Sequence, residues 1–137
     1  MSHLGSPFRA KLSSALILED LLIKHSKLRL FVMHAGYPFA GHTIALLYAH
    51  SQVHVEVGVI NWTSPRAEFH QFLQRLVDAG SIDRIMFGSD QMVWPGAIEI
   101  AVKSIEAAPF LGHAQNRAIL HDNAARFLRL NAKGNPH

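Results

Sequence analysis

Two side chains suited to chemistry each follow an apolar segment of the chain. His34 comes directly after Leu30–Met33, and Asp90 ends the stretch Arg84–Asp90 after a glycine and a serine. In parallel α/β proteins, the carboxyl ends of strands are where sites are built. An imidazole and a carboxylate placed there can transfer protons or bind a metal ion. We therefore expect His34 and Asp90 to be catalytic residues.

Three aromatic side chains lie within a few residues of expected strand ends. They are Tyr37, Trp62 and Trp94, and aromatic residues at such places can form the walls of an apolar pocket. We predict that these three bind substrate. Packing of the loops against the rest of the fold explains them equally well.

The composition limits the kind of site. Histidine is in excess, with ten residues, which favours metal or acid–base chemistry. Cysteine is absent, which excludes disulfides, thiolate ligands and cysteine nucleophiles. Since a chain without disulfides fits a reducing compartment, we expect a cytoplasmic protein.

Strand-like and helix-like patterns alternate along the chain. Three apolar stretches are typical of strands, at 28–33, 53–60 and 84–88. Helical spacing is found at 12–25, 40–49, 65–80, 95–107 and 114–130. The alternation predicts an α/β fold with three to four parallel strands and flanking helices. Because such a small parallel sheet leaves open edges, we expect a partner to cover them.

Two groups of polar residues have both structural and functional interpretations. His54 and Glu56 point to the same side of the strand predicted at 53–60, where they form a buried polar pair or lie at an exposed edge. Asn123 and its neighbours in the last helix are expected to attach that helix to an adjacent loop.

Length and charge narrow the class of protein further. At 137 residues the chain has the size of one domain, and we interpret 1–137 as a single domain. The formal charge of +3 is spread along the chain, so we expect no nucleic-acid partner. No apolar run approaches the roughly 18 residues that a membrane span needs, so we expect no membrane partner.

Three motifs carry a resemblance to a known family. They are His34-Ala-Gly-Tyr-Pro38 after the first strand, Phe87-Gly-Ser-Asp90 after the third, and Ala118–Leu128 in the closing helix. In this order they resemble the C-terminal part of the amidohydrolase-related metal-dependent hydrolases, the group that includes aminocarboxymuconate-semialdehyde decarboxylase. The similarity runs from about residue 3 to residue 130.

The resemblance implies a partial (β/α)8 barrel of the TIM type, from a remnant of strand five to strand eight and the closing helix. It implies that Asp90 takes the place of an aspartate that binds a divalent metal, with Zn²⁺ as the expected ion. His34 takes the place of a histidine that polarises the substrate or activates water, and His3 matches a metal-ligand histidine. The implied activity is hydrolysis or decarboxylation of a small carbonyl or carboxylate substrate.

One element of the family pattern is missing. Such enzymes usually take further metal ligands from a His-x-His on the first strand, and this sequence contains no His-x-His. We therefore expect a second chain to complete the barrel, in a homodimer or another homo-oligomer. The alternative is a half-barrel that no longer catalyses a reaction and acts as an assembly or binding module.

Overall fold

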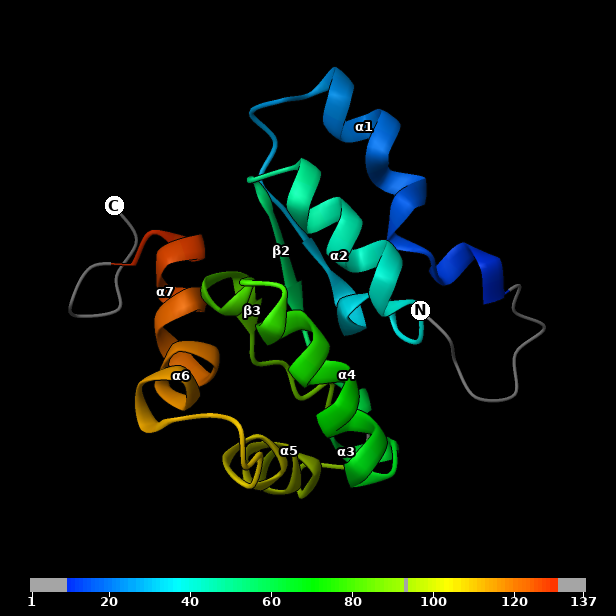
Figure 1. Ribbon diagram of the computed structural model, residues 1–137. Coiled ribbons are helices and arrows are strands. Elements are labelled where there is room, and N and C mark those ends of the chain that lie inside the picture. The colour runs from blue at the N-terminus through cyan, green and yellow to red at the C-terminus, as the bar shows by residue number, and fades with distance from the viewer. Residues whose placement is uncertain (1–9, 93, 131–137) are drawn as a thin grey trace.

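A three-stranded parallel sheet lies at the centre of the computed structural model, which describes residues 10–92 and 94–130 (Figure 1). The strands β1 (Leu30–Val32), β2 (Val53–Glu56) and β3 (Ile85–Met86) pair in chain order. The carboxyl ends of parallel strands meet at one edge of the sheet, so the residues that follow the three strands are brought together.

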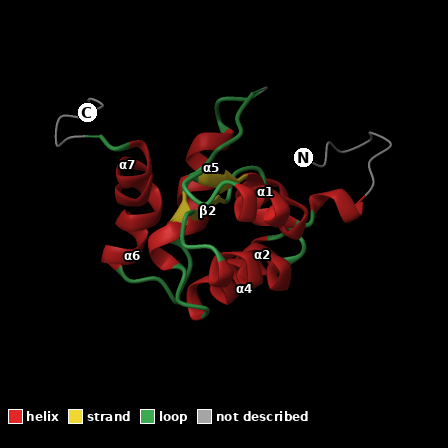
Figure 2. Cartoon of the chain, turned by 90° about the horizontal axis from the view of Figure 1, so that it is seen from above, coloured by secondary structure: helices red, strands yellow, loops and turns green. Residues whose placement is uncertain are grey.

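Helices make the connections between the strands. One helix, α2 (Ala40–Ala49), joins β1 to β2, and two helices, α3 (Ile60–Thr63) and α4 (Arg66–Asp78), join β2 to β3. The elements after β3 are α5 (Ala97–Glu106), α6 (His113–Arg117) and α7 (Asn123–Leu128). Those before β1 are two 3-10 turns, Ala10–Ser13 and Ala15–Leu18, and α1 (Glu19–Lys24). Seen from above, α2 and α4 lie together on one side, and α6 and α7 lie on another (Figure 2).

One face of the sheet forms the core, and the other is partly open. Val53, Val55 and Ile85 are fully buried, in one cluster with side chains of α2 and α4. On the opposite face of β1, Phe31 is 46% exposed. Its ring packs edge to face against Phe127 of α7, with the ring centroids 5.8 Å apart. The closing helix therefore covers only part of this face.

The free edge of β3 is covered by the closing helical segment. The Met86 carbonyl accepts a hydrogen bond from the β2 side, so the backbone groups of Ile85 and Phe87 point to the free edge. Asn123 Nδ2 donates to the Ile85 carbonyl at 2.6 Å. The Phe87 N–H donates at 2.8 Å to the carbonyl of Ile119, in a π-helical turn between α6 and α7. The expected attachment of the last helix through Asn123 is confirmed, and the chain itself covers an edge for which the sequence predicted a partner.

The structure corrects two predicted elements. The sequence predicts one helix over 12–25, but only Glu19–Lys24 is α-helical. The Ser14 hydroxyl accepts the Leu16 N–H and starts a separate turn there. The sequence also predicts a strand over 53–60, which ends at Glu56 because the Glu56 carboxylate binds the Gly58 N–H and turns the chain.

The remaining predicted helices and strands are present, with ends that differ by a few residues. No helix within residues 10–92 and 94–130 is long and apolar enough to cross a bilayer.

Candidate active site

His34 lies at the carboxyl end of β1, in a turn of left-handed residues. Its φ is 54°, and Ala35 and Gly36 continue at 48° and 66°. A non-glycine residue in this conformation costs about 1–3 kcal/mol and persists only where its surroundings fix it. The buried Thr43 hydroxyl contributes by donating to the Ala35 carbonyl at 2.7 Å.

Glu56, at the end of β2, is the buried carboxylate that fixes the turn from the other side. Its Oε1 accepts the His34 backbone N–H, and its Oε2 accepts the Gly58 N–H, both at 2.6 Å. A Cβ atom at Gly88, after β3, would overlap Oε2, so glycine makes room for the carboxylate. Glu56 therefore contacts the segments that follow all three strands.

The imidazole of His34 has one fixed nitrogen and one free nitrogen. Nδ1 lies 2.9 Å from the Gly58 carbonyl oxygen and 3.3 Å from Glu56 Oε1. Because both neighbours only accept hydrogen bonds, Nδ1 carries a proton in either charge state, and Nε2 is the atom that exchanges one. Nε2 faces Asp90 Oδ2 at 3.8 Å.

The buried pair of Glu56 and His34 favours the charged form of both groups. The side-chain hydrogen bond to Glu56 raises the pKa of His34, and this effect outweighs burial, which lowers it. Burial acts to raise the pKa of Glu56, but the hydrogen bonds from His34 and Gly58 outweigh it, so this pKa lies below its ordinary value. The site therefore has a fixed anion behind an imidazole that binds a proton more tightly than usual.

Asp90 also has a left-handed backbone, with φ of 47°. Two side chains of α3 hold the chain just before it. Asn61 Nδ2 donates to the Gly88 carbonyl at 2.9 Å, and Trp62 Nε1 donates to the Ser89 carbonyl at 2.7 Å. The Asp90 side chain is 20% exposed, so its carboxylate is largely enclosed.

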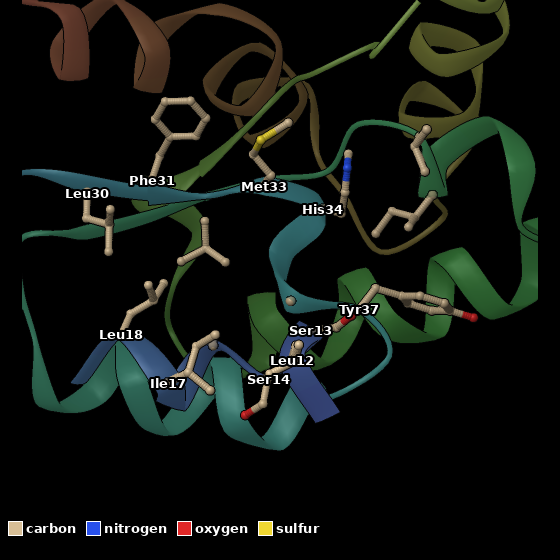
Figure 3. A pocket seen from close by; sticks show the side chains of 15 residues that line it. Leu12, Ser13, Ser14, Ile17, Leu18, Leu30, Phe31, Met33, His34 and Tyr37 are labelled. Atoms are coloured by element: carbon tan, nitrogen blue, oxygen red, sulfur yellow. The ribbon is translucent and has the colours of Figure 1, made fainter. Parts of the chain in front are cut away.

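Two cavities border the pair of His34 and Asp90. One, of about 260 Å³, lies beside β1 and is lined by His34, Tyr37 and apolar side chains. Figure 3 shows His34 and Tyr37 at one end of it, and Leu18 and Leu30 at the other. The second, of about 300 Å³, has Glu56 and Asp90 in its lining together with apolar residues of the open sheet face and of α7. His34 thus borders the first space and Asp90 borders the second.

Comparison with known proteins places the chain in a family. The sequence profile of the amidohydrolase family matches residues 1–130. The chain belongs to this family. No significant match is found among curated proteins.

Solved structures of several proteins resemble this amidohydrolase chain. An amidohydrolase from Burkholderia multivorans is 21% identical with a TM-score of 0.64, over 83% of this chain and 49% of that one. A 5-carboxyvanillate decarboxylase from Sphingomonas paucimobilis is 17% identical with a TM-score of 0.64, over 89% and 40%. A putative 2-pyrone-4,6-dicarboxylic acid hydrolase from Pseudomonas putida is 22% identical with a TM-score of 0.63, over 85% and 48%.

These neighbours are TIM barrels, and the amidohydrolase chain spans about half of their length or less. Three parallel strands with flanking helices are therefore part of such a barrel. The predicted fold class and the predicted family are confirmed.

The three predicted substrate-binding aromatics lie in two places. Trp62 and Trp94 pack edge to face beside the Asp90 loop, with ring centroids 6.4 Å apart. Tyr37 lines the cavity next to His34, and its ring packs edge to face against Phe72 at 5.3 Å. Packing therefore accounts for part of each contact, and their role toward substrate stays a prediction.

The predicted metal ligands are placed only in part. Within residues 10–92 and 94–130, no three histidine, aspartate or glutamate side chains are grouped to hold a metal ion. His3 lies outside the described residues. The imidazole nitrogen of His34 and the carboxylate of Asp90 are donors of the kind that bind divalent cations. They fit part of a metal site, whose other ligands would come from elsewhere.

The sequence did not predict the roles that Glu56 and Asn61 have in the site. One interpretation of the sequence is a buried pair of His54 with Glu56. In the structure the His54 ring lies against Phe127, with ring centroids 4.9 Å apart, and Glu56 binds His34. A signal was available in the glycines just after two strands, since such glycines often mark a close approach of another group. For Asn61, we find no signal in the sequence.

Proposed function

We propose that this chain is the C-terminal half of a metal-dependent hydrolase or decarboxylase that acts on a small carbonyl or carboxylate substrate. One observation carries the proposal: His34 lies between two carboxylates, with Glu56 bound behind it and Asp90 3.8 Å in front of its free nitrogen. Membership of the amidohydrolase family supports it, and so do structural neighbours named as hydrolase and decarboxylase.

His34 is the proton-handling residue in this proposal. Glu56 stabilises the imidazolium, and the Gly58 carbonyl keeps Nδ1 protonated, so that Nε2 gains and loses the proton on the side of Asp90. In a hydrolysis, Nε2 orients the attacking water and accepts its proton. In a decarboxylation, the imidazolium holds the substrate carboxylate and donates the proton that replaces CO₂.

Asp90 is the residue that would hold the divalent cation. When bound, such a cation lowers the pKa of a water molecule to about 7 and polarises a carbonyl group. We propose Zn²⁺, because a crystal of the Burkholderia multivorans amidohydrolase contains zinc. His3 and ligands from outside the described residues would complete the site.

The aromatic side chains supply the apolar contacts to substrate in this proposal. Tyr37 shares a cavity with His34. Trp94 is 52% exposed, and its ring packs edge to face against Trp62 beside the Asp90 loop. A small substrate in contact with Tyr37 would lie in the cavity that His34 borders.

A second copy of the chain completes the barrel in this proposal, with 1–137 acting as one domain. The chain matches 49% of the Burkholderia multivorans neighbour, so two copies have about the length of one such protein. Phe31 of β1 and Met33 in the turn directly after it, which are 46% and 43% exposed, would be buried by the second copy. We propose a cytoplasmic homodimer or other homo-oligomer, with no nucleic-acid or membrane partner.

A second candidate function is an assembly or binding module without activity of its own. The observation that favours it is the lack of a three-ligand metal group within residues 10–92 and 94–130.

Metal content and molecular mass of the purified protein distinguish the two functions. We expect bound Zn²⁺ at about one atom per two chains or more, and a dimer or larger oligomer by light scattering. Asp90→Asn and His34→Gln should each weaken Zn²⁺ binding at least about tenfold. The matched control is Asp122→Asn, because Asp122 pairs with His121 on the surface at 2.8 Å. A metal-free monomer, or equal metal content in Asp90→Asn, would exclude the enzyme as proposed.

A further inference from the structure

The loop that carries Asp90 is held by two consecutive side chains of α3. Asn61 binds the Gly88 carbonyl at 2.9 Å and Trp62 binds the Ser89 carbonyl at 2.7 Å, so two consecutive carbonyls just before Asp90 are fixed. We propose that Asn61 and Trp62 are positioning residues that aim the Asp90 carboxylate at His34 and at the cation that Asp90 would hold. This inference rests on the function proposed for the pair of His34 and Asp90.

The backbone of Asp90 needs such support. Its φ of 47° lies in the left-handed region, which residues other than glycine rarely adopt. The Asp90 carbonyl accepts the Met92 N–H at 3.0 Å, which closes a tight turn after it. Once the carbonyls before Asp90 are released, the loop relaxes toward a commoner backbone conformation. The carboxylate then leaves its place 3.8 Å from His34 Nε2.

Asn61 is a costly residue for a core position. It is 2% exposed, and its Oδ1 is buried without a hydrogen-bond partner among the described residues. A buried unpaired polar atom costs about 1–3 kcal/mol, which an apolar side chain of the same size would avoid. The bond to the Gly88 carbonyl gives a physical reason for an amide at this position.

Trp62 contacts the chain on both sides of Asp90. Its indole N–H binds the Ser89 carbonyl, and its ring packs edge to face with Trp94 at an interplanar angle of 74°. One rigid side chain therefore limits the movement of the loop before and after the carboxylate. Neither Asn61 nor Trp62 is required to touch substrate or metal for this role.

A double-mutant cycle on Zn²⁺ affinity tests the proposal. Trp62→Phe keeps an aromatic ring and removes the N–H, and we expect it to weaken Zn²⁺ binding about tenfold. In an Asp90→Asn background the same change should have no further effect, because the carboxylate that it positions is gone. The matched control is His70→Phe, which removes another ring nitrogen bound to a backbone carbonyl, that of Ser104 at 2.8 Å, and should leave Zn²⁺ affinity unchanged.

Amide hydrogen exchange in the metal-free protein gives an independent measurement. We expect the Met92 amide to exchange about tenfold faster in Trp62→Phe than in the wild type or in His70→Phe. Asn61→Leu should act in the same direction and serves as the second variant if Trp62→Phe does not fold.

The outcomes separate the two proposals. Unchanged Met92 exchange in both variants overturns the positioning role, and so does an equal loss of Zn²⁺ affinity with and without the Asp90 carboxylate. Faster Met92 exchange in the variants, together with a wild-type chain that binds no Zn²⁺, supports the positioning of the loop and overturns the proposed metal site.

Discussion

Side-chain N–H donors hold the chain at both ends of the strand β3, and they have different effects at the two ends. At its amino end, Asn123 donates to the carbonyls of Ile82 and Ile85 at 2.7 and 2.6 Å. At its carboxyl end, Asn61 and Trp62 bind the carbonyls that lead to Asp90. The first set joins a closing helix to the strand, whereas the second set fixes a loop in a left-handed conformation.

Backbone angles follow the same division. The described non-glycine residues with positive φ are His34, Ala35, Val59, Asp90 and Arg129. The first four follow the carboxyl ends of strands, and only Arg129 belongs to the closing segment. Strained backbone angles of this kind persist where the surrounding contacts fix the conformation, and they cluster at functional sites. We call the contacts of the closing helix with β3 the closing end, and the residues that follow the carboxyl ends of the strands the site end. We expect changes at the closing end to alter stability alone, and changes at the site end to alter both stability and site geometry.

The largest expected effect is at the closing end. Asn123→Ala leaves two carbonyls without their donor, and Asn123 is fully buried. We expect the free energy of unfolding to fall by about 2–4 kcal/mol, measured by urea denaturation. Asn116→Ala, in the neighbouring α6, is the control and should cost less than about 1 kcal/mol. A change in Zn²⁺ affinity of the folded Asn123→Ala protein would break the comparison.

At the site end, Glu56→Gln should lower the free energy of unfolding by about 1–3 kcal/mol. The amide accepts only one of the two backbone N–H groups that the carboxylate binds, and its own N–H₂ group faces the other. Unlike Asn123→Ala, this variant should also weaken Zn²⁺ binding. Equal Zn²⁺ affinity in Glu56→Gln and wild type would show that the turn at His34 does not depend on this carboxylate.

The Glu56 effect should depend on pH. The pKa of Glu56 is lowered from 4.5, so its contribution is complete above that value and is lost as pH falls through the folded pKa. The pKa of His34 is raised from 6.5, so its contribution is complete below 6.5 and is lost as pH rises through the folded pKa. The stability difference between wild type and Glu56→Gln should therefore be largest between pH 4.5 and 6.5. A difference that is flat from pH 4 to 9 would contradict the ion pair.

A smaller effect is expected at Thr43, which supports the left-handed turn from α2. Thr43→Val removes the hydroxyl that donates to the Ala35 carbonyl in the core, and should cost about 1–2 kcal/mol in thermal or urea unfolding. Thr63→Val removes an exposed hydroxyl bond to the Val59 carbonyl at the same distance of 2.7 Å. This control should change stability by less than about 0.5 kcal/mol. An equal loss of stability in Thr43→Val and Thr63→Val would mean that burial of the hydrogen bond does not determine its contribution.

The smallest effect should be stabilising and lies in the closing segment. Arg129 ends α7 with φ of 57° and is exposed. Arg129→Gly removes the steric cost of this angle, and we expect a gain of about 0.5–1 kcal/mol in unfolding free energy. Zn²⁺ affinity should not change. A loss of stability would indicate that the arginine side chain contributes contacts at this end.

The sequence could predict the sheet and two members of the site, and the reasons are physical. An apolar run followed by a polar residue indicates a buried strand and its carboxyl end. This pattern identified His34 and Asp90. Alternation of strands and helices implied a parallel sheet, which then brings these two ends together. The family motifs pointed to the same two residues.

The rest of the site depends on contacts that no local pattern records. Glu56 binds the His34 backbone only because β1 and β2 pair with Leu30 level with Val53. The helix that carries Asn61 and Trp62 is four residues long, too short to show a helical period. The covered edge of β3 depends on a π-turn carbonyl at Ile119, which a helical pattern does not reveal.

The pairing of β1, β2 and β3 in chain order also has a consequence for synthesis. As the polypeptide leaves the ribosome, each new strand finds its neighbour already made, so the sheet can grow by addition at one edge. The segment that contains Ile119 and Asn123 is translated after all three strands, and it binds the edge to which a further strand would add. The order in which the strands are translated is thus the order in which the sheet assembles, and the edge at which it grows is covered last.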